Sequence, residues 1–201
     1  VFKFTLHGPV DNPWGSPNGL SVQAFDVYID QDGPASGARL LLPGRNGALA
    51  ADYGWDWALW VNGWTPTLYR VGADGEPEVV QTDIQVLPDP GQRKVTVKIP
   101  WSVLAGAPDD CQNWRYAALL MSHDGYGPHS LREIEAGPSQ WQAGGRPEAT
   151  NYPRIFDLAW PVAGTPTQEE MLSTYPLSQQ PVEELEADDF AQLEMLAATV
   201  P

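Results

Sequence analysis

The chain has 201 residues, of which 42% are hydrophobic and 18% are charged, with 19 Gly and 20 Pro. This length and turn-rich composition predict one large globular domain, or one domain with an appendage, rather than two equal domains or a disordered chain. A formal net charge of -15 would repel a phosphate backbone or an anionic bilayer, so we expect no nucleic acid and no membrane surface among its partners.

Short apolar segments separated by Gly, Pro, Asn and Asp clusters follow one another along the first 160 residues. The predicted strands span residues 1–6, 20–30, 38–42, 55–61, 67–71, 79–87, 94–99 and 115–121. A single helical turn is expected at 100–104, and short edge strands at 132–134 and 155–158. Repeated short strands at this spacing favour an all-β fold of two packed antiparallel sheets over a βαβ fold.

The composition changes after residue 164, and we divide the chain there into a β-sandwich module, 1–164, and an acidic extension, 165–201. The extension has eight acidic residues and no Lys or Arg. Pro181 suits the first position of a helix, and apolar residues from Val182 to Ala198 roughly share one face, which predicts an acidic amphipathic helix. We expect its apolar stripe to fold back on the sandwich; docking on a neighbouring domain or chain is the alternative.

Membrane insertion and disulfide bonds are not expected. No stretch of sequence reaches the roughly 20 apolar residues that span a bilayer, and the chain opens without the basic n-region of a signal peptide. The single cysteine, Cys111, rules out an intrachain disulfide framework and a cysteine-based zinc cluster.

Motifs for catalysis are scarce. Ser122, His123 and Asp124 are adjacent, but a catalytic triad is a spatial arrangement that neighbours on one backbone rarely satisfy. The sequence has no Gly-x-Ser-x-Gly, phosphate-binding glycine loop or His-Glu-x-x-His motif. Acidic residues are plentiful, but abundance does not place two carboxylates across a cleft as a glycosidase requires. We therefore expect no enzyme and name no catalytic residue.

Three aspartates are candidate metal ligands. Asp26, Asp30 and Asp32 come from the end of one predicted strand and its turn. Calcium binds several carboxylate and carbonyl oxygens, which such a turn could supply. The sequence therefore predicts a structural calcium ion here; simple capping of an Asp-Gly turn is the alternative.

Tryptophan is unusually abundant, and four of the nine residues lie within ten positions, at Trp55, Trp57, Trp60 and Trp64. On a strand, Trp55 and Trp57 would share one side and Trp60 would take the other, so all four rings cannot enter one core. A flat indole stacks on the C–H face of a sugar while nearby polar groups bond its hydroxyls. With Tyr126 of a second aromatic loop, residues 123–129, these rings are the predicted ligand-binding residues; burial in the core is the alternative for each tryptophan.

Several sequence blocks resemble one protein family. Residues 12–30 read NPWGSPNGLSVQAFDVYID, 38–46 ARLLLPGRN, 99–104 IPWSVL and 116–128 YAALLMSHDGYGP. In this order, over residues 2–160, they resemble the C-terminal module of glucodextranase, also found on bacterial and archaeal amylopullulanases.

The resemblance implies a DOMON-like jelly-roll sandwich, related to family 9 carbohydrate-binding modules and appended to extracellular starch- and dextran-active enzymes. It also implies strands upstream of Val1, so we expect the chain to be a piece of a larger polypeptide.

These observations predict a non-catalytic module, extracellular or at the cell surface, that binds polysaccharide or a cell-wall glycan as part of a glycoside hydrolase or envelope protein. A structural domain that packs on a catalytic domain or an envelope partner is the first alternative. A redox subunit is the second, because DOMON-like folds elsewhere hold haem; its axial ligands would come from Met121, Met171, Met195 and the three histidines.

Overall fold

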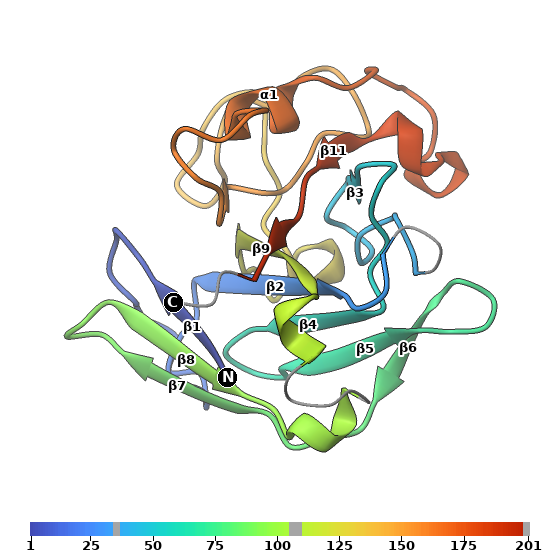
Figure 1. Cartoon of the computed structure of the whole chain (residues 1–201). Coiled ribbons are helices and arrows are strands. Elements are labelled where there is room, and N and C mark those ends of the chain that lie inside the picture. Colours follow the sequence, from blue (N-terminus) through green and yellow to red (C-terminus); the bar gives the residue numbers. More distant parts are fainter. Residues whose placement is uncertain (34–36, 105–109, 199–201) are drawn as a thin grey trace.

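Two antiparallel sheets pack face to face in the computed structural model, which describes residues 1–33, 37–104 and 110–198 (Figure 1). The smaller sheet has the order β1 (Phe2–Thr5), β8 (Lys94–Lys98) and β7 (Gln85–Asp89). The larger sheet has the order β10 (Asp157–Leu158), β9 (Arg115–Ser122), β2 (Gln23–Asp30), β4 (Trp57–Val61), β5 (Thr67–Val71) and β6 (Pro77–Val80). Strand β12 (Leu196–Ala197) also pairs with β9. The chain is therefore mostly β, in the arrangement of a β-sandwich.

Strand β2 lies at the centre of the larger sheet, between β9 and β4. Its nearly unbroken apolar run is buried from Ala24 to Asp30, as suits a strand covered on both faces. Phe25, Val27 and Ile29 face the core between the two sheets. On β8 only alternate residues, Val95 and Val97, enter that core, since this strand is half exposed.

A third layer covers the other face of the larger sheet (Figure 1). It contains β3 (Gly47–Leu49), which pairs in parallel with β11 (Ala191–Leu193), and helix α1 (Gln168–Ser173). Tyr28 and Trp60 from the sheet and Met171 and Leu193 from this layer belong to one buried cluster. The central strands β2 and β4 of the larger sheet are consequently covered on both faces, whereas its outer strand β6 stays partly exposed.

The predicted helix over 182–198 is wrong. This segment forms two 3-10 turns, η4 (Val182–Glu184) and η5 (Ala187–Asp189), followed by β11 and β12. Like charges three and four residues apart, such as Glu184 and Asp188, disfavour a helix, and the backbone of β11 pairs with β3 instead.

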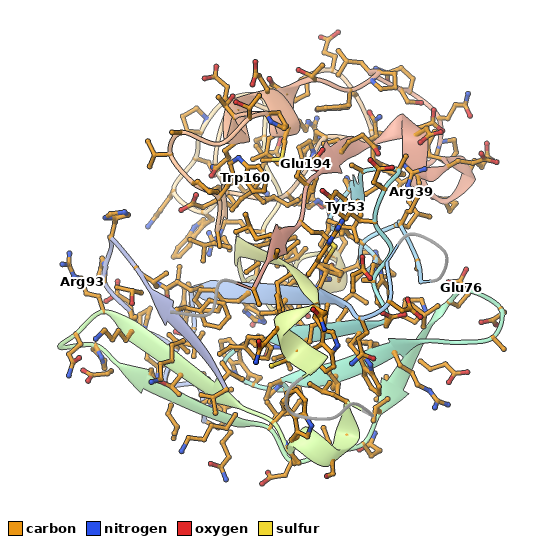
Figure 2. The ribbon with its side chains drawn as sticks, viewed as in Figure 1. Arg39, Tyr53, Glu76, Arg93, Trp160 and Glu194 are labelled. Atoms are coloured by element: carbon orange, nitrogen blue, oxygen red, sulfur yellow. The ribbon has the colours of Figure 1, made fainter. Side chains whose placement is uncertain are left out.

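The extension nevertheless folds back onto the rest of the chain. Arg39 forms an ion pair of 2.8 Å with Asp188, and Glu194 interacts with Tyr53, labelled beside it in Figure 2. The domain boundary at residue 164 stays a prediction.

The remaining differences concern short elements. Residues 38–42 form only isolated bridges, from Ala38 to Trp55 and from Leu40 to Ala48. The segment predicted as one strand, 79–87, divides into β6 and β7, which lie in different sheets. The predicted helical turn is present as η1 (Trp101–Val103), and further 3-10 turns are η2 (Asp110–Gln112) and η3 (Pro128–Ser130).

Candidate functional site

The start of β2 and the ends of its two neighbours, β4 and β9, lie at the same end of the larger sheet. Strand β2 is antiparallel to both neighbours, with Gln23 opposite Ser122 and Phe25 opposite Val61. Three loops therefore meet at this end of the sheet: residues 11–22, 62–66 and 123–131.

Backbone contacts hold these three loops together. The Asn18 N–H donates to the Gly63 carbonyl at 3.0 Å, and the His123 N–H donates to the Val22 carbonyl at 2.7 Å. Gly63 is required for this approach, because a Cβ added to it would lie 1.7 Å from the Leu20 carbonyl oxygen. The side chains of the three loops are thus carried on one connected surface.

Aromatic rings are exposed on this surface. Trp14 is 51% exposed, Trp64 is 39% exposed and Tyr126 is fully exposed. The Trp64 ring stacks on His123, with ring centroids 4.5 Å apart and planes inclined by 20°. We call Trp14, Trp64, His123 and Tyr126 the aromatic end of the sheet.

His123 supports the Trp64 ring from beneath. The imidazole is buried, and burial lowers its pKa, with a smaller opposing effect from Asp124 and a lowering effect from Arg132. The neutral ring is therefore the favoured form at neutral pH, and it packs on the indole without a buried charge. Asn62 fixes the loop, since its Oδ1 accepts from the backbone N–H groups of Trp64 and Thr65, both at 2.8 Å.

The structure separates the four clustered tryptophans. Trp55 is fully buried and donates Nε1–H to the Leu40 carbonyl at 2.7 Å, and Trp60 is buried against the Arg45 guanidinium, 4.3 Å from its ring centroid. Trp57 is half-buried at the start of β4, the end of the strand away from Trp64. Trp55 and Trp60 therefore present no face to a sugar, which corrects their prediction as binding residues; of the four, Trp64 lies at the aromatic end.

The prediction that Trp55 and Trp57 share one side of a strand is also wrong. Trp57 packs in the core between the sheets, whereas Trp55 joins Trp60 in the cluster under the third layer. The alternation fails because β4 begins at Trp57, leaving Trp55 in a bridge before the strand.

Trp14, Trp141 and the support from His123 were not predicted. Trp14 lies in a loop rich in Asn, Pro and Gly, where an isolated aromatic residue is the one available signal. Trp141 is 60% exposed, and its carbonyl accepts from Arg132, whose Nε also donates to Ser122 Oγ at 3.0 Å. This contact connects Trp141 to the end of β9, next to the aromatic end.

The opposite ends of the same strands carry a group of carboxylates. Asp30 ends β2, Asp32 follows in the turn, and Asp56 immediately precedes β4. One oxygen from each lies within 4.8 Å of the others. The Gly33 N–H donates to Asp30 Oδ1 at 2.6 Å, and the Gln31 N–H donates to Asp56 Oδ2 at 2.7 Å. We call these three aspartates the carboxylate end.

Asp26 is not part of the carboxylate end, although it was predicted as a third ligand. Its side chain is fully buried and accepts from Arg45 Nε at 2.7 Å, Arg45 Nη2 at 3.1 Å and the Tyr28 hydroxyl at 2.8 Å. Although burial lowers the pKa of Arg45, the carboxylate of Asp26 raises it above the ordinary value. Burial and the same carboxylate raise the pKa of Tyr28. Asp26 is thus neutralised by arginine, and Asp56 takes its place beside Asp30 and Asp32.

The residues considered for catalysis and for haem have other contacts. Ser122 Oγ accepts from Arg132 and the His123 ring stacks on Trp64. Met121, Met171 and Met195 are packed in the buried cluster beneath the third layer.

The fold is that of a β-sandwich module, and three loops at one end of its larger sheet carry exposed aromatic rings. The model of a family described as the C-terminal binding module, SLH-like, of glucodextranase matches residues 1–185, and the chain belongs to this family. The resemblance found in the sequence is thereby confirmed. No curated protein matches the chain. Across the described residues, no helix has the length and apolar character to cross a membrane.

Proposed function

We propose that this chain is a non-catalytic module that binds polysaccharide or a cell-surface glycan through its aromatic end. The family description supports a binding role. In this proposal the module serves an extracellular glycoside hydrolase or envelope protein, and its sandwich is a DOMON-like jelly roll.

The observation that carries the proposal is the position of the Trp64 ring. It is partly exposed, yet its orientation is fixed by the stack on His123 and by the Trp64 backbone N–H, which donates to Asn62 Oδ1. A fixed exposed indole can stack on a pyranose with little loss of side-chain entropy, and the neighbouring loops carry two further exposed rings, Trp14 and Tyr126. The net charge of -15 repels anionic glycans, so neutral glucans are the favoured class.

The structure weakens the alternative in which the C-terminal segment docks on another domain. That alternative requires an exposed apolar stripe, but Phe190, Leu193 and Met195 are buried against the rest of this chain. If no glycan binds, the favoured alternative is that the sandwich packs on a catalytic domain through another surface.

The test is titration calorimetry with maltooligosaccharides, isomaltooligosaccharides and peptidoglycan fragments. A shallow platform buries little area, so we expect dissociation constants of micromolar to millimolar order for at least one neutral glucan. Trp64→Ala should weaken binding at least about fivefold, since a stacked ring contributes roughly 1 kcal/mol or more. Val79→Ala, which truncates an exposed residue on β6, is the matched control and should bind like the parent chain.

Two results would contradict the proposal. The first is the absence of binding to every glycan of the panel. The second is a Trp64→Ala, Tyr126→Ala double variant that binds as well as the control.

A further inference from the structure

The carboxylate end has the dimensions of a site for one divalent cation. Calcium–oxygen distances are about 2.3–2.6 Å, so oxygens on one ion lie at most about 5 Å apart. The oxygens of Asp30, Asp32 and Asp56 fall within this limit, at no more than 4.8 Å from one another. They come from two strand ends that are adjacent in the sheet, with Ile29 opposite Trp57.

A second observation concerns Asp30 alone. Asp30 is 1% exposed, and among the described residues its Oδ2 atom has no hydrogen-bond partner, whereas Oδ1 accepts from the Gly33 N–H. Removing an ionised carboxylate from water is strongly disfavoured when one of its oxygens finds no new hydrogen bond, unless a cation compensates the charge. Arg115 is opposite Asp30 in the register, but its guanidinium lies over the Tyr53 ring at 5.2 Å.

The chemistry of the ligands selects the cation. All three groups are hard oxygen donors without His or Cys, a set that favours calcium or magnesium over zinc. Calcium accepts irregular oxygen geometry and takes further ligands from carbonyls and water, whereas magnesium demands a near-ideal octahedron. Carboxylates set in a turn and at a strand end, at unequal depths of burial, fit the more tolerant ion.

We propose that Asp30, Asp32 and Asp56 bind one calcium ion that joins the end of β2 to the start of β4. Two backbone donors already orient the ligands, the Gly33 N–H on Asp30 and the Gln31 N–H on Asp56. The ion compensates the unpartnered Asp30 oxygen and connects residues that are 26 positions apart in the chain. The site and the aromatic end lie at opposite ends of the strands, so the test of the site does not depend on glycan binding.

The experiment measures calcium binding to the full chain by calorimetry and by terbium luminescence. Terbium replaces calcium, and Trp57 is a nearby sensitiser because its Nε1–H donates to Gln31, between Asp30 and Asp32, at 3.1 Å. We expect one saturable site per chain, with calcium displacing terbium. Calcium at about 100 times its dissociation constant should raise the unfolding midpoint by roughly 5–10 °C.

Variants assign the site to its residues. Asp32→Asn changes an exposed ligand, so the variant should fold, and it should weaken calcium binding at least about tenfold because ligand charge sets affinity. Asp56→Asn should act in the same direction. Asp83→Asn is the matched control, since Asp83 is also exposed but lies in the connection between β6 and β7, and it should bind calcium like the parent chain.

The outcomes decide the proposal as follows. Loss of binding in Asp32→Asn and Asp56→Asn with retention in Asp83→Asn supports it. Absence of saturable calcium binding to the parent chain overturns it, as does unchanged affinity in both ligand variants. Magnesium binding as tight as calcium binding overturns the choice of ion.

Discussion

Replacement of Asp26 by Ala tests whether the buried ion pair with Arg45 supports the centre of the fold. Both side chains are buried, with exposed fractions of 0% for Asp26 and 5% for Arg45. The substitution removes three hydrogen bonds to the carboxylate, two from Arg45 and one from the Tyr28 hydroxyl. The guanidinium then keeps the Pro43 carbonyl at 2.9 Å and the face of Trp60.

The expected loss follows from this uncompensated charge. Breaking a buried ion pair from one side costs about 3–5 kcal/mol, a large fraction of the roughly 5–15 kcal/mol that stabilises a typical domain. The exposed pair of Arg70 and Glu78, at 2.8 Å with side chains 58% and 48% exposed, gives the scale for comparison. Removing it with Arg70→Ala should cost at most about 1 kcal/mol.

The assay is urea unfolding followed by tryptophan fluorescence, which yields the free energy of unfolding for each variant. The double variant Asp26→Leu, Arg45→Met removes both charges and should be more stable than Asp26→Ala, because no unpaired charge remains. A supporting role for the buried ion pair is excluded if Asp26→Ala loses no more stability than Arg70→Ala, or if the double variant is no more stable than Asp26→Ala.

Three further predictions concern the aromatic end and the C-terminal segment. Burial lowers the pKa of His123 below its ordinary 6.5, so the folded chain binds fewer protons than the unfolded chain in acid. The His123 contribution to stability should therefore be complete above pH 6.5 and should fall as the pH drops to the lowered pKa. Urea unfolding at several pH values in this range should show that the free energy of unfolding changes less with pH in His123→Asn than in the parent chain. Gly63→Ala should displace the loop that carries Trp64, because its Cβ would meet the Leu20 carbonyl, and should cost about 1–3 kcal/mol by the same assay and weaken glycan binding; full retention of both would contradict the close approach. Thr167→Ala should cost about 1 kcal/mol, because it removes the capping box with Glu170 at the start of α1; thermal unfolding identical to that of the parent chain would be inconsistent with a role for this cap.

The strands were largely predictable because their signal is local. The segment 67–71 was predicted with the bounds of β5, and the alternation of Val95 and Val97 gave the buried face of β8. The third layer was not predictable in this way. Strands β3 and β11 are three residues each, and they pair Gly47 with Ala191 across most of the chain, so neither segment carries a period long enough to reveal its partner.

The candidate site was predictable by residue type more than by position. Spacing alone indicated that some tryptophans face outward, but the start of β4 and the Gly63 contact determine that Trp64 is the exposed one. Asp26 and Asp30 were predicted as ligands because they come from one strand and its turn. Their spacing could not show that Arg45, from a distant loop, would neutralise Asp26.

The burial of β2 on both faces constrains how this module can diversify. A slip of one residue in its pairing would exchange Phe25 and Val27 with Asp26 and Tyr28, placing the Asp26 charge in the core between the sheets and separating it from Arg45. Insertions are thus intolerable along the strand and harmless only in the loops beyond its two tips. Variation in what such modules recognise should accordingly accumulate at those tips, while the strand between them stays nearly invariant.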